Sequence, residues 1–196
     1  MTGKDIFKIT LNLVIVYLVG GFILAFVYAN ASPKIFQNNE KAEQDALKLL
    51  IPGADFSKPK EWTIHDKHAK YFEAKKDGET VGYVIQSFGK GYSSYINTFI
   101  AVDRDFKVLK INILGHGETP GLGDEIETDS FKNQFAGKDI DHLKVLKTDT
   151  TEYIQAISGA TISTRAVSED AVKNGVAFLI KTIKEGGTTD VQHQQH

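Results

Sequence analysis

The chain of 196 residues contains no cysteine, and it has no excess of charge of either sign. The missing thiols exclude disulfides, thiolate-held iron–sulfur clusters, cysteine zinc ribbons and a cysteine nucleophile. Because 23 basic side chains are balanced by 25 acidic ones, the sequence has no electrostatic footprint for nucleic acid. If this chain moves electrons, its cofactor is organic, or it is a metal held by nitrogen and oxygen.

One long stretch, residues 9–29, carries no charge and is rich in Leu, Val, Ile and Phe. At about 1.5 Å per residue a helix over this stretch is roughly 31 Å long, which matches the hydrocarbon core of a bilayer. The stretch predicts a transmembrane helix held in the lipid bilayer. A cleaved signal peptide is the alternative, because Ala29-Asn30-Ala31 fits a small-x-small cleavage pattern, but signal peptides have apolar regions of only about 7–15 residues.

Flanking charges predict the orientation of this helix. Lys4 and Lys8 precede the apolar stretch, whereas Lys34 alone follows it closely. The positive-inside rule therefore predicts a cytoplasmic N-terminus at 1–8 and a single pass through the cytoplasmic membrane. The soluble domain is then expected on the periplasmic or extracellular side.

The rest of the chain predicts one α+β domain at 40–187, joined to the anchor by a linker at 30–39. Its first element is a helical pattern over 40–51, which ends at Pro52-Gly53. The polar residues 188–196 show no periodicity and are expected to be disordered.

Alternating apolar residues and turn signals predict a largely antiparallel sheet. Asp77-Gly78 is a strong hairpin signal between strands at 71–75 and 80–88. Strands at 95–102 and 107–114 follow as further hairpins. The other expected elements are a strand region at 62–71, a short helix at 130–135, and strands near 143–146 and 153–157.

The stretch 157–164 places three kinds of small residue, serine, threonine and glycine, directly before a long helix. The apolar periodicity predicts that helix from Arg165 to about Lys184, with Ser163 or Thr164 as its N-cap. A glycine-containing loop at a helix start can bind an anion, although the helix dipole adds only about 0.3–1 kcal/mol per exposed charge. An ordinary strand-to-helix turn with a hydroxyl cap fits the same spacing.

A second glycine-rich loop, residues 114–125, follows the strand predicted at 107–114. Its four glycines allow close approach to a flat ligand, but the loop could equally be a long surface turn. Metal sites at His116 with neighbouring acids, or at His65 with His68, are not predicted, because neither set has three convergent ligands. No catalytic residue is predicted either, since Ser158 and Thr161 have no base evident in the sequence.

Both loops resemble those of a known family. Ser158-Gly159-Ala160-Thr161, followed by Ile162-Ser163, is similar to the flavinylation motif of the FMN-binding domain in two proteins. These are the G subunit of the Rnf ferredoxin:NAD oxidoreductase complex and the C subunit of the sodium-translocating NADH:quinone reductase. Glu118-Thr119-Pro120-Gly121-Leu122-Gly123 and the segment ending in Gly91-Tyr92 also resemble this family. Gln155 stands where the family usually carries aspartate.

The resemblance implies that FMN is joined by its phosphate to Thr161. It also implies that further residues shape the loop or lie beside the flavin: Ser158, Gly159, Ala160, Ile162, Ser163, Glu118, Thr119, Gly121, Leu122, Gly123 and Tyr92. The expected function is electron transfer in a membrane-bound, ion-translocating ferredoxin:NAD oxidoreductase, with no complete activity for the isolated chain. The expected partners are membrane and iron–sulfur subunits of the complex and a flavin transferase.

Three alternatives stay open from the sequence. The shorter soluble domain favours the Rnf protein over its counterpart in the quinone reductase. A membrane-tethered module that binds a small ligand noncovalently would need no redox step. A structural subunit with a vestigial motif is the third alternative, for which Gln155 is the hint.

Overall fold

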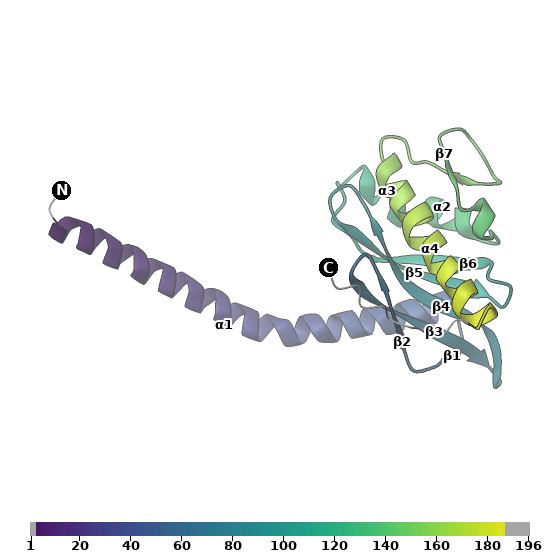
Figure 1. The fold of residues 1–196 in the computed structure, drawn as a ribbon, viewed down its shortest axis with the longest axis horizontal. Coiled ribbons are helices and arrows are strands. Elements are labelled where there is room, and N and C mark those ends of the chain that lie inside the picture. The colour runs from purple at the N-terminus through teal and green to yellow at the C-terminus, as the bar shows by residue number, and fades with distance from the viewer. Residues whose placement is uncertain (1–2, 187–196) are drawn as a thin grey trace. The chain divides into compact units, whose positions relative to one another are not determined.

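The computed structural model describes residues 3–186, so the tail predicted to be disordered at 188–196 lies outside the described residues. Contacts divide the chain into two compact units, Met1–Gln44 and Asp45–His196. The second unit contains the sheet, the glycine-rich loops and the C-terminal helices (Figure 1).

A single helix, α1 (Gly3–Leu50), includes the apolar stretch and continues through 30–39, where a linker was expected. That expectation is corrected: no glycine occurs from Phe22 to Pro52, and Pro33 is the one helix-breaking residue before Pro52. Helix-favouring Ala, Lys, Glu and Gln surround it, so the missing amide of one proline does not end the helix. Within the described residues, α1 alone is long and apolar enough to cross a membrane.

The main sheet is antiparallel throughout, as predicted. Its strands are β1 (Asp55–Phe56), β2 (Lys60–Ile64), β3 (Lys67–Lys76), β4 (Glu79–Lys90), β5 (Tyr95–Asp103) and β6 (Val108–Gly115). The order is β1-β3-β4-β5-β6, and β2 also pairs with β3. The strand region expected at 62–71 is therefore a hairpin rather than one strand.

Two tight turns explain this difference. Asp77 and Gly78 join β3 to β4 with φ of 54° and 84°, the left-handed conformation that such hairpin turns require, and this turn was predicted. His65 and Asp66 join β2 to β3 with φ of 50° and 59°. Because neither residue is glycine or asparagine, the sequence carried no comparable signal for the second turn.

The strands alternate between the two faces of the sheet. On β4, Val84 packs on the face covered by Leu47 and Leu50, whereas Ile85 packs on the opposite face. On β5, Phe99 and Ile100 divide between the faces in the same way. Both faces are therefore buried, and the period of two residues fixes the register of the sheet.

Helices at the C-terminal end cover the larger of these two cores (Figure 1). The helical run consists of α3 (Thr161–Arg165), the π-helix η4 (Ala166–Val172), α4 (Lys173–Leu179) and the π-helix η5 (Ile180–Lys184). Its buried side chains include Val172, Val176 and Leu179. Strands and helices are segregated, so the predicted α+β class is confirmed.

The segment between the sheet and this run holds short elements. They are η1 (Gly123–Glu127), α2 (Asp129–Lys132), η2 (Asn133–Phe135), η3 (Ile140–His142), β7 (Val145–Leu146) and β8 (Ile154–Gln155). β7 and β8 pair in parallel, an arrangement that the sequence did not predict. β8 is followed directly by the loop that precedes α3.

Candidate functional site

The loop of residues 157–160 leads into α3, which starts at Thr161 and therefore earlier than the predicted start at Arg165. Ala160 occupies the cap position without a side-chain hydrogen bond, so the prediction that Ser163 or Thr164 caps the helix is wrong. Both hydroxyls lie inside the first turn and bond to other groups. The apolar pattern of the helix did not reach back to this polar turn, which explains the error.

The buried side chain of Thr164 joins the loop to the first turn of α3 through two hydrogen bonds. Its hydroxyl donates to the carbonyl of Ala160 at 2.9 Å and accepts from the amide of Ile157 at 3.1 Å. Gly159 has φ of 79°, and a Cβ at this position would lie 2.8 Å from Cδ1 of Leu122. Glycine is therefore required here both by the backbone conformation and by the close approach of the second loop.

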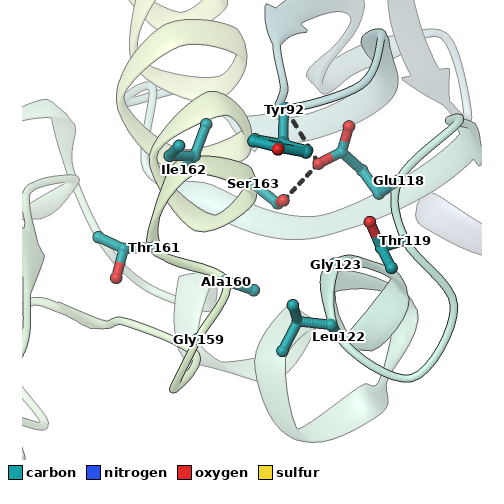
Figure 2. Close-up of a pocket in the computed structure, with 10 residues that line it drawn as sticks. All are labelled: Tyr92, Glu118, Thr119, Leu122, Gly123, Gly159, Ala160, Thr161, Ile162 and Ser163. Carbon is teal, nitrogen blue, oxygen red and sulfur yellow. Dashed lines mark hydrogen bonds between the residues drawn. The ribbon is translucent and has the colours of Figure 1, made fainter.

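The two glycine-rich loops and the first turn of α3 enclose a pocket of about 440 Å³ (Figure 2). This volume lies within the range of roughly 300–1,000 Å³ typical of small-molecule sites. Ten residues line the pocket: Tyr92, Glu118, Thr119, Leu122, Gly123, Gly159, Ala160, Thr161, Ile162 and Ser163. All ten are among the residues that the sequence motifs selected.

The remaining two selected residues, Ser158 and Gly121, are not among the pocket-lining residues of the described chain. Gly121 has φ of 72° and forms the turn that lets the amides of Leu122 and Gly123 bond to the carbonyl of Thr119. It therefore shapes the loop and presents Leu122 to the pocket.

Thr161 lies at the edge of the pocket. Its side chain points away from Tyr92 and Glu118, and no other pocket residue lies beyond it in Figure 2. The first intrahelical hydrogen bond of α3 runs from the amide of Thr164 to the carbonyl of Ala160. The amides of 161–163 therefore precede the helical ladder, as the first amides of any helix do.

The pocket rim is apolar and exposed. Beyond residue 50, the exposed large apolar side chains of the described chain are Tyr92, Leu109, Leu122 and Ile162, and three of these four line the pocket. Tyr92 is 72% exposed, Ile162 54% and Leu122 42%. Concentrated apolar exposure of this kind indicates a surface that another group covers.

Glu118 is the buried charged residue of the site, with 5% of its surface exposed. Its carboxylate accepts from the backbone amides of Tyr92, Ser93 and Ser94 and from the hydroxyl of Ser163. Burial by itself raises the pKa of Glu118, but these hydrogen bonds outweigh burial and hold the pKa below its usual value. The carboxyl is therefore ionised at neutral pH.

Two of the three histidines considered as metal ligands, His65 and His116, lie within hydrogen-bonding distance of a carboxylate. His65 Nε2 lies 2.7 Å from Oδ1 of Asp170, and His116 Nε2 lies 3.0 Å from Oε1 of Glu127. Residues 3–186 contain no group of three or more His, Cys, Asp or Glu side chains that could hold a metal ion.

Comparison with known proteins connects this geometry to a family. The FMN-binding domain family matches residues 91–177, which include both pocket loops. The G subunit of the proton-translocating ferredoxin:NAD(+) oxidoreductase complex of Clostridium ljungdahlii is 39% identical over 178 residues, covering 88% of this chain and 91% of the relative. The chain belongs to this G-subunit family.

Other relatives agree with this assignment. The G subunit of the Na(+)-translocating ferredoxin:NAD(+) oxidoreductase complex of Acetobacterium woodii is 30% identical, covering 84% of this chain and 87% of the relative. The crystal structure of NqrC from Shewanella oneidensis has a TM-score of 0.52 at 27% identity, covering 60% of this chain and 62% of that chain. The predicted family is therefore confirmed, and its FMN-binding domain supports the predicted cofactor.

Sequence reasoning missed several residues that build the pocket walls. Ser93 and Ser94 donate backbone amides to Glu118, and the hydroxyl of Ser94 accepts from the amide of Gly117 at 2.8 Å. Thr164 was considered as a helix cap, and its hydrogen bonds to Ala160 and Ile157 were not predicted. No local signal could have identified the roles of Ser93 and Ser94, because their partners lie far away in the sequence.

Proposed function

We propose that the Thr161 hydroxyl carries FMN through a phosphoester and that the chain relays electrons within a membrane-bound, ion-translocating ferredoxin:NAD oxidoreductase complex. The position of Thr161 carries this proposal: a half-buried hydroxyl stands at the first residue of α3, on the edge of an apolar-rimmed pocket. A ligand tethered there reaches the pocket without leaving the protein.

The residues present fit FMN at both of its ends. The phosphate would lie by Thr161 and the amides of 161–163, where a helix start favours an anion. The flat, largely apolar ring would lie against the rim formed by Tyr92, Leu122 and Ile162. FMN supplies one- and two-electron chemistry, which a chain without cysteine lacks among its own side chains. The protein positions the ring and limits its contact with water.

Attachment requires an enzyme, because a threonine hydroxyl is a weak nucleophile without an adjacent base. A flavin transferase would supply an activated flavin nucleotide. The Thr161 oxygen would bond to phosphorus and lose its proton, and the leaving group would depart with the electrons of the broken phosphorus–oxygen bond.

Thr161→Ala tests the tether. We expect the variant to carry no flavin that survives denaturation, whereas native protein shows a fluorescent band and a fixed mass increment on the peptide containing residue 161. Ser158→Ala is the matched control, because it removes a neighbouring hydroxyl outside the pocket lining. Flavin that stays with denatured Thr161→Ala protein, or a bare Thr161 in the native host, would contradict the proposal.

For the topology, we propose that residues 9–29 span the membrane with 1–8 in the cytoplasm and the globular unit on the periplasmic or extracellular side. The chain has no cysteine, so single cysteines report cleanly. In intact cells a membrane-impermeant maleimide should label Lys58→Cys and leave Lys4→Cys unlabelled. The reverse pattern would contradict this orientation.

A further inference from the structure

Glu118 connects three segments that are distant in the sequence: its own loop after β6, the loop that joins β4 to β5, and the first turn of α3. We propose that Glu118 is a positioning residue that holds these walls in the flavin-accepting arrangement before any flavin is attached. The role assigned to this arrangement rests on the proposed function, whereas the arrangement itself is set by contacts among the protein's own residues.

The carboxylate divides its contacts between its two oxygens. Oε1 accepts from the amides of Ser93 at 3.0 Å and Ser94 at 3.4 Å. Oε2 accepts from the amide of Tyr92 at 3.1 Å and from the hydroxyl of Ser163. All four partners are donors, and an ionised carboxylate is a pure acceptor, so charge and hydrogen-bonding capacity match. A glutamine in place of Glu118 would turn one acceptor oxygen into an NH2 group, which would face N–H or O–H donors that it cannot bond.

Two glycines make room for this carboxylate. A Cβ on Gly91 would lie 2.5 Å from Oε1 of Glu118, and a Cβ on Gly123 would lie 2.8 Å from Glu118 Cβ and 3.1 Å from Ser163 Oγ. Real Cβ atoms essentially never approach within 3.0 Å of such atoms. Glycines on both sides therefore accommodate the acid, and this requirement accounts for part of the glycine content of the two loops.

Further hydrogen bonds hold the backbone of Glu118 and the residue before it. The amide of Glu118 donates to Nδ1 of His116 at 3.1 Å, while Nε2 of that ring lies 3.0 Å from Oε1 of Glu127. The amide of Gly117 donates to Ser94 Oγ at 2.8 Å. Glu118 is therefore held by its backbone as well as by its side chain, and its carboxylate has a defined direction.

The hydrogen bonds of Glu118 connect the three segments that carry the apolar residues of the pocket rim. Tyr92 belongs to the β4–β5 loop, Leu122 to the loop that carries Glu118, and Ile162 to the first turn of α3. Each of these apolar rim residues stands on one of the three segments that the Glu118 carboxylate ties together. The Gly117–Ser94 hydrogen bond joins two of these segments, whereas the Glu118 carboxylate joins all three.

The test uses full-length, flavin-free protein carrying Thr161→Ala, with Glu118→Gln, Ser163→Ala or both added, and measures amide hydrogen exchange. We expect Glu118→Gln to speed exchange of the amides of 92–94 by about tenfold or more, as expected for the loss of a charge-assisted hydrogen bond. Ser163→Ala should act most on the Tyr92 amide, which shares Oε2 with Ser163. Glu125→Gln is the matched control, because its side chain is exposed on a neighbouring turn.

The double variant distinguishes a shared bond from two separate effects. Since Ser163 acts through Glu118, Ser163→Ala should add little to Glu118→Gln, so the combined change should fall well short of the product of the single changes. Unchanged exchange at 92–94, or strictly multiplicative effects, would overturn the proposal. If Glu118→Gln prevents folding, the local effect of Ser163→Ala on Tyr92 decides by itself.

A second readout separates positioning from general stability. In flavin-loaded protein, Glu118→Gln removes a fixed negative charge from the pocket lining, so electron uptake by the flavin becomes easier and its midpoint potential should shift positive. Ser163→Ala leaves the charge of Glu118 in place and should shift the flavin midpoint potential much less. Equal shifts in both variants would contradict the role of the charge. A failure of the exchange experiment leaves the flavin tether intact, whereas a bare Thr161 in native protein would overturn the tether alone.

Discussion

The three hydroxyls that follow Ala160 have different roles despite their closeness. Thr161 stands at the pocket edge, Ser163 donates to buried Glu118, and Thr164 joins the loop to the helix. Spacing alone could not separate these roles, because each depends on which way a side chain points from the first turn of a helix. The resemblance selected Thr161, whereas the roles of Ser163 and Thr164 required the structure.

Gly89, where β4 contacts η4, gives the first prediction for a single residue. A Cβ on Gly89 would lie 1.8 Å from the carbonyl oxygen of Ala166. Because that oxygen belongs to the helix backbone, no side-chain movement could relieve the clash. We expect Gly89→Ala to lower the free energy of unfolding by about 1–3 kcal/mol or more, measured by urea denaturation. Gly115→Ala is the control, since nothing lies within 4 Å of its Cβ position. Equal effects of the two changes would contradict this explanation.

The lowered pKa of Glu118 predicts a pH dependence of stability. A carboxyl with a lowered pKa in the folded state stabilises fully above its unfolded pKa, here about 4.5, and loses this contribution as the pH falls through the folded pKa. The urea midpoint of native protein should therefore fall toward acid more steeply than that of Glu118→Gln, and the difference between the two curves should narrow as the pH falls through the lowered folded-state pKa of Glu118.

Some acid sensitivity should persist in this variant. The hydrogen bond from Thr80 lowers the pKa of Glu73, and the contact with His142 lowers the pKa of Asp139. Parallel pH curves for native protein and Glu118→Gln, measured in the same urea series, would show that Glu118 does not contribute to the acid transition.

At the scale of elements, the sequence predicted what local patterns determine. The hairpin at Asp77-Gly78, the strands β5 and β6, and the C-terminal helix all appear in the structure. The predicted alternation of β6 holds only in part, because Leu109 is exposed where the register with β5 shifts. The sequence did not predict the β2–β3 turn, which has no glycine. It predicted strands near β7 and β8 but not their parallel pairing. The motifs selected the residues that line the pocket, whereas the hydrogen bonds of the Glu118 carboxylate link residues 24 to 45 positions apart.

Among residues 3–186, three buried hydroxyls have no hydrogen-bond partner: those of Ser87 on β4, Thr98 on β5 and Ser168 on η4. Ser87 and Thr98 pair directly across β4 and β5. Unpaired buried hydroxyls are costly, so Thr98→Val and Ser168→Ala should leave stability unchanged or raise it by up to about 1 kcal/mol. Thermal unfolding measures the effect. A loss above about 1 kcal/mol would show that the hydroxyls are bonded, for example through a buried water.

At the scale of the whole globular unit, the sheet is covered on both faces by segments from opposite ends of the sequence. Ala46, Leu47 and Leu50 pack against Phe72 and Phe99 on one face. The helices from α3 to η5 cover the other face. The last turns of α1 are therefore part of the fold of the globular unit as well as a continuation of the apolar N-terminal helix.

This arrangement predicts where the chain can be shortened. A fragment of residues 45–196 should fold as a soluble domain, whereas 52–196 lacks Leu47 and Leu50 and exposes Phe72 and Phe99. Losing a buried leucine costs about 2–5 kcal/mol, so the two losses approach the total stability of an ordinary domain. Size-exclusion chromatography and thermal unfolding should show 52–196 aggregated or unfolded, with Leu47→Ala in 45–196 intermediate. Equal stability of the two fragments would contradict this role.

The C-terminal helices also constrain when the cofactor can be added during biosynthesis. One face of the sheet stays uncovered until Leu179 has left the ribosome, because the side chains that bury it follow the sheet in the sequence. The pocket joins Tyr92 to Ser163 through Glu118, so its walls meet only after that helix docks. If flavin is attached at Thr161 as proposed above, the pocket walls that would receive it are in place only after residues 161–179 have been synthesised and have docked on the sheet.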